Sequence, residues 1–404
     1  MPADPVDSRP ESWTVANNHP RPRSAATTHP DGSAASADLV GRRLVNQRLI
    51  AARDTSPESV VTGLGAVQAQ DYLGAKWAVA QRAGACTDAA VEDALDRGAI
   101  LRTHVLRPTW HFVAPADIRW LLALTAPRVH ALNAPYNRQT GLDARAFTRG
   151  DAALAKALQG QHYLTRDELR AVLREAGVAA DGLRLALLLM HAELEGVICS
   201  GPRRGKQFTY AALDERAPAT PALQRDEALA ELARRYFASH GPARPRDLAW
   251  WSGLRVTDAQ AAIRMLGTAV ESRVVGDETY WRATGARRPR RRPAPRVHLL
   301  PSYDEYVIGY RDHAPIMDAA HAATLGVRGG LVGASVVIVD GRVAGNWRRT
   351  LRRAGVAIEV KLLLPLDDAA RAALARETER YGRFLSLPAR LDVSVPRRAR
   401  AKKR

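Results

Sequence analysis

Two neighbouring segments constrain the fold of this chain more than any other feature. The first, VQAQDYLGAKWAVAQ, begins at Val67 and carries two amides, Gln68 and Gln70. These amides follow an apolar run that starts near Val60, which predicts a helix that ends just before them. The sequence therefore places two polar side chains, two residues apart, at the end of a helix.

The second segment, ILRTHVLRPTWHFVAPADIRWLL, alternates apolar and polar residues on both sides of Pro108. A period of two is typical of strands, so the segment predicts a strand pair with the proline at its turn. Residues 117–124 then return to a helical pattern. Helices, a two-stranded ribbon and another helix together indicate a winged-helix-like unit.

A similar order of elements follows in the next part of the chain. Thr165 and Glu168 form a capping box that opens a helix to Ala176. The helix predicted for residues 183–194 is apolar on nearly all sides, so we expect it to be buried rather than to lie in a DNA groove. A ribbon between residues 197–198 and 208–210 closes this second unit.

The pattern occurs a third time with different residues. Helices are predicted over 226–239, 246–251 and 257–266, and a ribbon follows that turns at Gly276 and Asp277. The recurrence of a ribbon after helices indicates three tandem winged-helix units.

The C-terminal region has another pattern. Residues 336–339 and 342–347 predict two strands joined at Asp340 and Gly341, a pair that accepts the positive φ of a type I′ turn. Further strands are predicted over 358–364 and 390–395, with a helix over 367–384 between them. The predicted fold class is therefore α+β, mainly α, with three winged-helix units and a C-terminal α+β domain that contains a β-hairpin.

These patterns divide the chain into seven parts. In order, the predicted parts are a disordered leader (1–38), the first winged-helix-like unit with the Gln-x-Gln motif (39–140), the second winged helix (141–216), the third winged helix (217–284), an Arg/Pro-rich linker (285–296), the C-terminal domain (297–396) and a basic tail (397–404).

The net charge of +18 is concentrated in two places. Six arginines lie within residues 287–296 and six Lys or Arg within 397–404, and neither stretch contains an acidic residue. Polybasic segments bind nucleic acid by releasing counterions, and they also bind anionic membranes. The chain has no run of 18 apolar residues, so we expect damaged double-stranded DNA as the partner rather than a membrane.

Other features limit the chemistry. Cys86 and Cys199 are too few and too isolated for a disulfide framework or a zinc site, and no phosphate-binding, dinucleotide-binding or metal-binding motif is present. We therefore expect no cofactor and no metal, and a cytoplasmic, nucleoid-associated monomer.

Three motifs in order along residues 39–395 resemble a known family. They are the Gln-x-Gln pair, R-P-T-W-H-F-V-A-x-x-D-I-R-W-L-L from Arg107, and H-L-L-P-S-Y-D-E-Y-V-I-G-Y-R-D-H from His298. Together they resemble the bacterial winged-helix DNA-binding-domain proteins that include the AlkZ and YcaQ DNA glycosylases. The resemblance implies excision of N7-alkylated purines, including crosslinked ones, and identifies Gln68 and Gln70 with the Gln-x-Gln branch.

Amide side chains suit such chemistry because a cationic N7-alkylpurine leaves readily. The enzyme then needs mainly to hold one water and to offer dipoles to the developing charge, which the carbonyl and NH₂ groups of glutamine can do. The alternative is that Gln68 and Gln70 are two solvated polar side chains. Asp304 is a second candidate for a catalytic carboxylate, with a helix or turn cap as its alternative. Asp71 is expected mainly to cap the next helix, with the carboxylate that the amide pair lacks as its alternative role.

Candidate DNA contacts come from several segments. A hairpin can insert into a groove and an indole can stack on a base, although a tryptophan and a histidine on a strand are equally typical of a core. Wing tips commonly contact phosphates, with a solvated charged loop as the alternative. The predicted DNA-contacting residues are Arg107, Trp110, His111, Arg203, Arg204, Lys206 and Arg311.

The sequence therefore favours a monofunctional DNA glycosylase. Two other classes stay open: a non-catalytic winged-helix DNA-binding protein or transcription regulator, and a resistance protein that sequesters a DNA-alkylating compound. A regulator would read a palindrome through a polar recognition helix, which the apolar helix of the second unit does not offer.

Overall fold

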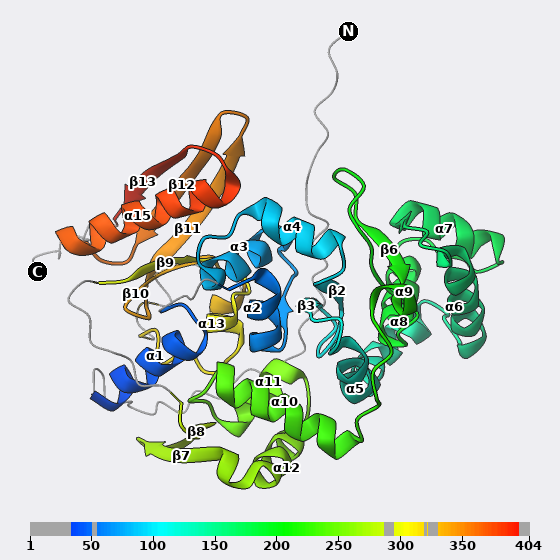
Figure 1. The fold of residues 1–404 in the computed structure, drawn as a ribbon, viewed down its shortest axis with the longest axis horizontal. Helices are drawn as coiled ribbons and strands as arrows, with labels where there is room; N and C mark the ends of the chain where they lie inside the picture. The colour runs from blue at the N-terminus through cyan, green and yellow to red at the C-terminus, as the bar shows by residue number, and fades with distance from the viewer. Residues whose placement is uncertain (1–33, 51–54, 287–294, 319–320, 322–329, 396–404) are drawn as a thin grey trace, which may run out of the picture.

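The computed structural model describes residues 34–50, 55–286, 295–318, 321 and 330–395 (Figure 1). Most of the predicted leader and linker, and the whole basic tail, lie outside the described residues. Residues 34–38, which the sequence analysis assigned to the leader, form the start of the first helix, α1.

The first unit contains the predicted ribbon and more helix than expected. Its elements are α1 (Ala34–Asn46), α2 (Pro57–Leu64), β1 (Val67–Gln68), α3 (Tyr72–Ala83), α4 (Asp88–Asp96), β2 (Leu101–His104), β3 (Trp110–Val113) and α5 (Ile118–Gln139). The strands form an antiparallel sheet in the order β1-β3-β2. The predicted helix over 117–124 is confirmed, and it continues to Gln139 through two internal prolines.

The second unit has the same order of elements. It comprises α6 (Ala144–Leu158), β4 (Leu164–Thr165), α7 (Arg166–Glu175), α8 (Leu183–Leu194), β5 (Ile198–Ser200), β6 (Thr209–Ala212) and the short α9 (Leu213–Arg216), with the sheet order β4-β6-β5. The capping box of Thr165 and Glu168 is present, and most of the leucines of α8 are buried, as predicted.

The third unit follows the same plan in a simpler form. It comprises α10 (Arg225–Ser239), α11 (Pro245–Ser252), α12 (Val256–Leu266), a 3-10 turn (Gly267–Ala269), β7 (Val270–Val275) and β8 (Glu278–Ala283). A single antiparallel bridge between Ala243 and Trp281 replaces the short first strand of the other two units. Each unit thus pairs helices with a small antiparallel ribbon, and their assignment as three winged helices stays our interpretation of this arrangement.

A five-stranded sheet forms the C-terminal domain. Its elements are β9 (Val297–Leu300), α13 (Glu305–Ile308), a 3-10 turn (Leu331–Gly333), β10 (Val336–Val339), β11 (Arg342–Arg352), β12 (Gly355–Leu362), α15 (Asp368–Leu385) and β13 (Ala389–Ser394), with the strand order β13-β12-β11-β10-β9. Asp340 and Gly341 both have positive φ, as the predicted hairpin turn requires. The fold class is α+β, mainly α.

Strand β10 is buried on both faces of the sheet, and its successive side chains point to opposite faces. Val336 and Ile338 pack in a cluster with leucines of α1, whereas Val337 packs with Trp77 of α3 and with α15. The N-terminal helix α1, expected within the first unit, therefore packs on the C-terminal domain. In Figure 1 the first unit lies at the centre, with the second unit to its right, the third below and the sheet with α15 at the upper left. No helix among the described residues is long and apolar enough to cross a membrane.

Candidate functional site

The two glutamines lie at the short strand β1 and the bend that follows it. Gln68 ends β1 opposite His111 of β3, and its side chain is buried, whereas Gln70 is exposed. The backbone N–H of Ala69 donates to the carbonyl of Trp110 at 2.7 Å, so the pairing with β3 continues past β1. The strand thus holds one amide inside the protein and presents the other at the surface.

Arg107 fixes the side chain of Gln68. Its Nη2 donates a hydrogen bond to Oε1 of Gln68 at 2.6 Å. Arg107 comes from the bend between β2 and β3, where Leu106 adopts a φ of 64°. Gly253 of the third unit lies against this bend: a Cβ at Gly253 would lie 2.5 Å from the Leu106 carbonyl oxygen. A close approach between two units therefore supports the conformation that carries Arg107.

His111 lies buried beside Arg107 as a neutral imidazole. Its Nδ1 donates to the carbonyl of Thr109 at 2.9 Å, which leaves Nε2 as an acceptor 3.5 Å from Nη2 of Arg107. Burial, and then the charge of Arg107, lower the pKa of His111 to about 3. The complete burial of His111 favours a core role over direct contact with DNA.

A carboxylate that the sequence analysis left without a role lies directly behind Gln68. The backbone N–H of Gln68 donates to Oε1 of Glu305 at 2.8 Å. The other oxygen accepts from the indole of Trp251 at 2.8 Å and from Nε2 of His240 at 3.2 Å. Burial alone would raise the pKa of this carboxyl, but the bonds from His240 and Gln68 outweigh burial and hold the pKa below its ordinary value.

Asp304, the second-choice catalytic carboxylate, is engaged elsewhere. Its two oxygens accept from the guanidinium of Arg82 at 2.7 and 2.9 Å, and both side chains are fully buried. Asp304 also caps α13 by accepting from the N–H of Tyr306. This geometry favours the cap that the sequence analysis gave as the alternative, because a carboxylate bound to a buried arginine has no free lone pair facing solvent.

Asp71 connects the Gln-x-Gln segment to the C-terminal sheet. It caps α3, as expected, by accepting from the N–H of Gly74. Its carboxylate also pairs with Arg349 of β11 at 2.8 Å. The long β11–β12 hairpin, which carries exposed Arg348, Arg352 and Arg353, is thereby tied to the residue that follows Gln70.

The remaining predicted DNA contacts are spread over the surface. Trp110 is half-buried, with the Arg102 guanidinium 4.2 Å from its ring centroid. At the second wing, Arg203 lies over the rings of Tyr72 and Phe208, and Arg204 pairs with Glu168 at 2.7 Å. Lys206 and Arg311 are exposed.

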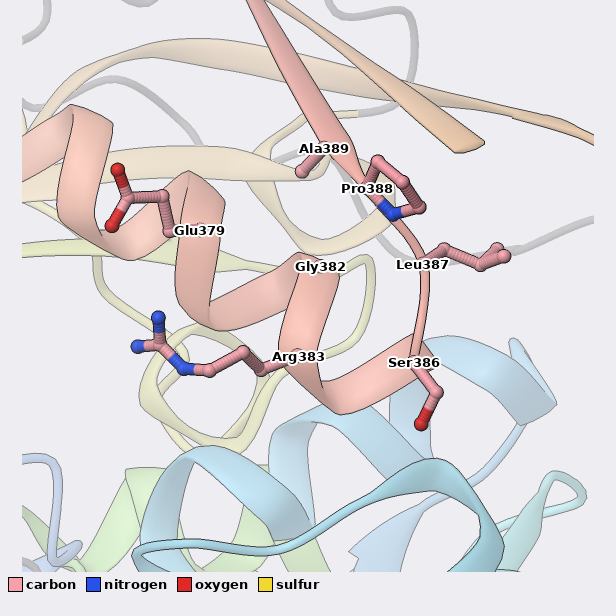
Figure 2. A pocket seen from close by; sticks show the side chains of 7 residues that line it. All are labelled: Glu379, Gly382, Arg383, Ser386, Leu387, Pro388 and Ala389. Carbon is pink, nitrogen blue, oxygen red and sulfur yellow. The ribbon is translucent and has the colours of Figure 1, made fainter. Parts of the chain in front are cut away.

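Two other features of the molecule lie apart from these residues. The pocket in Figure 2 lies between the end of α15 and β13, and none of the predicted site residues lines it. Among the described residues, His130, His191 and Glu195 place potential metal-ligand atoms within 4.8 Å of one another. His130 already pairs with Glu195, and His191 with Asp151.

Comparison with known proteins identifies the family. A sequence model of the AlkZ-like DNA glycosylases matches residues 61–384. The chain belongs to the AlkZ-like DNA glycosylase family. It is therefore an enzyme of the hydrolase class, and the resemblance seen in the sequence motifs is confirmed; its assignment to the Gln-x-Gln branch stays a prediction.

Two matches from Streptomyces sahachiroi, one in sequence and one in structure, extend this result. A relative described as an interstrand DNA cross-link repair glycosylase is 27% identical over 319 residues, which are 76% of this chain and 85% of the relative. The solved structure of the DNA glycosylase AlkZ matches with a TM-score of 0.74 and 23% identity, covering 89% of this chain and 99% of that chain. The AlkZ-like fold therefore extends over nearly the whole molecule.

Proposed function

We propose that this chain, acting as a monomer, hydrolyses the N-glycosidic bond of N7-alkylated purines in double-stranded DNA with a water held by Gln68 and Gln70. A neutral amide cannot take up a proton as a carboxylate does, so the site suits only bases that already leave readily. An N7-alkylated purine is such a base because it is cationic before the bond breaks.

One observation carries the proposal: Glu305 holds the backbone N–H of Gln68 and Arg107 holds its side-chain carbonyl, while Gln70 is exposed. Arg107 occupies one lone pair of the Gln68 carbonyl and leaves the second for a water. A fixed acceptor and a nearby exposed amide are the parts needed to orient a nucleophile without activating it strongly.

We assign the DNA backbone to the arginine-rich surfaces near this segment. Exposed Arg348, Arg352 and Arg353 lie on the β11–β12 hairpin, which the Arg349–Asp71 pair joins to the Gln-x-Gln bend. Arg204 and Lys206 at the second wing, together with Arg311, supply further phosphate ligands. Asp304 holds the fold together through Arg82 and takes no part in the chemistry.

Interstrand crosslinks form a wider substrate class within this proposal. The relative from Streptomyces sahachiroi carries that activity in its description. A crosslink through N7 has the same cationic leaving group as a simple N7-alkylpurine, so the same water and the same amides serve both. Bulky and methyl adducts are therefore both expected to be released.

The test is direct excision. The protein is incubated with duplex DNA that bears N7-methylguanine, a bulky N7 adduct or uracil, and abasic sites are then cleaved with alkali. We expect cleavage at both N7 adducts and none at uracil or unmodified guanine, since neither leaves as readily. Efficient uracil release would contradict the amide mechanism.

The same assay separates the rival classes. A regulator would bind one sequence tightly and release nothing, and a sequestering protein would bind the free alkylating compound without touching DNA. The burial of α8 stands against base reading by that helix, since its leucines face the core of the second unit.

A further inference from the structure

A buried carboxylate stands behind the proposed catalytic amide. Glu305 is fully buried, and its two oxygens accept hydrogen bonds from the backbone of Gln68, the indole of Trp251 and the imidazole of His240. None of these three donors is an arginine or a lysine. The cost of burying this charge is met by oriented hydrogen bonds.

We propose that Glu305 is the positioning residue of this glycosylase, which fixes Gln68 and supplies the negative charge that a cationic sugar requires at the site. The inference rests on the proposed function of Gln68. It goes further by assigning the reaction a carboxylate that never touches the DNA.

The positioning role of Glu305 follows from the parts of the fold to which its three hydrogen-bond donors belong. Gln68 belongs to the first unit, and Trp251 and His240 belong to the third, while Glu305 begins α13 of the C-terminal domain. One carboxylate therefore holds three parts of the molecule in register. A shift of α13 relative to β1 would move the backbone of Gln68 and, with it, the water that the side chain holds.

The need for a negative charge on Glu305 follows from the positive charge of Arg107. Its guanidinium lies 2.6 Å from Oε1 of Gln68, so a positive charge stands close to where the sugar itself becomes positive. Like charges there would raise the barrier. Burial lowers the pKa of Arg107 to about 10, and the charge of Glu305 acts in the opposite direction, so the two groups interact. Glu305 offsets the charge of Arg107 and favours the oxocarbenium-like state.

The imidazole of His240 lies between Glu305 and Ser239. Its Nε2 donates to Glu305, and the hydroxyl of Ser239 lies 2.8 Å from its Nδ1. The Ser239 hydroxyl donates its one proton to the carbonyl of Arg235 at 2.7 Å, so it accepts at Nδ1 of His240. The charge of Glu305 therefore acts on both His240 and Arg107.

A second buried carboxylate provides a matched control. Glu193 of α8 pairs with Nδ1 of His104 and is almost fully buried, as Glu305 is with His240. Within the described part of the chain, Glu193 pairs with His104 and not with Gln68. Changing either carboxylate to an amide therefore disturbs a buried carboxylate–histidine pair, but only one of the two pairs supports the site.

The experiment compares Glu305→Gln and Glu193→Gln with the wild type. Single-turnover excision of N7-methylguanine is measured, together with affinity for two uncleavable duplexes: one with a pyrrolidine abasic-site analogue, which is cationic, and one with the neutral tetrahydrofuran analogue. Trp251→Phe, which removes one donor and keeps the charge, is measured in the same way. Thermal unfolding shows whether each variant is folded.

We expect Glu305→Gln to lower the excision rate and the preference for the cationic duplex by at least ~10-fold, with little change for the neutral duplex. Glu193→Gln should retain both properties, and Trp251→Phe should retain the preference. A Glu305→Gln variant that keeps the wild-type preference would overturn the inference while the proposed function stands. A wild type that neither excises N7-methylguanine nor prefers the cationic duplex would overturn the proposed function and this inference with it.

Discussion

The small sheets of the first and second units, called here the first and second wings, have the same topology, but different polar residues are buried in them. Their sheets are ordered β1-β3-β2 and β4-β6-β5, and in each a two-residue strand pairs with the last strand of the unit. Gln68 faces His111 across the first sheet, and at the corresponding place in the second sheet Thr165 faces Thr209. One scaffold thus carries a buried amide and imidazole in one copy and two hydroxyls in the other.

The two sheets also differ in which groups bind their buried polar side chains. Thr165 caps α7 within its own unit, so its polar group is satisfied locally. The polar groups at Gln68 are satisfied by Arg107 and by Glu305, the latter 237 residues away in the chain. A repeated scaffold can therefore hold a buried amide when a distant segment satisfies polar groups that the scaffold alone would leave buried and unpaired.

The largest expected effect concerns the ion pair that holds this distant segment. Arg82→Ala leaves Asp304 buried without its partner and should lower the free energy of unfolding by ~3–5 kcal/mol in urea titrations. In the second unit, Arg174→Ala breaks an exposed pair with Asp181 and should cost no more than ~1 kcal/mol. Equal losses would show that the two regions do not differ in their dependence on remote contacts.

The next largest effect is the pH dependence of stability that the buried His111 of the first wing causes. The pKa of His111 is about 3 when folded, well below its ordinary value of 6.5, so between these values the unfolded chain binds a proton that the folded chain does not. Stability therefore falls as pH drops below 6.5, by about 2 kcal/mol at pH 5 from this group. His111→Gln should lose less stability than the wild type between pH 7 and 5. Parallel stability curves would contradict the assignment.

The smallest effect concerns the exposed tip of the second wing. The double change Arg204→Ala and Lys206→Ala should flatten the slope of log K against log salt for duplex binding by about 1–2, since each lost phosphate contact accounts for ~0.9. Excision at saturating enzyme should not change. An unaltered slope would remove this wing from the DNA interface.

The sequence patterns predicted the features that depend on neighbouring residues alone, such as helix bounds, turns and caps. The bounds of α8 follow from a continuous apolar run between turn residues, and the hairpin at Asp340 and Gly341 follows from the positive φ that this pair tolerates. The cap at Asp71 follows from its place before a helix. The family assignment rested on ordered motifs, and it was confirmed.

Contacts between distant segments could not be predicted in this way. Nothing in the pattern around Asp304 and Glu305 distinguishes a carboxylate bound to a buried arginine from one that supports a glutamine backbone. The packing of α1 on the C-terminal sheet also joins opposite ends of the chain. Helix α6 was missed, although its Leu154 and Leu158 pack with leucines of α8 in the core of the second unit.

We propose that Gln68 and Gln70 act directly on the damaged nucleotide. The most direct measurement is single-turnover excision of N7-methylguanine by the double variant Gln68→Ala and Gln70→Ala. The matched control is Gln207→Ala, an exposed glutamine beside the tip of the second wing. We expect at least a ~10²-fold lower rate for the double variant at nearly constant DNA affinity, and no change for the control. A double variant that excises at the wild-type rate would contradict it.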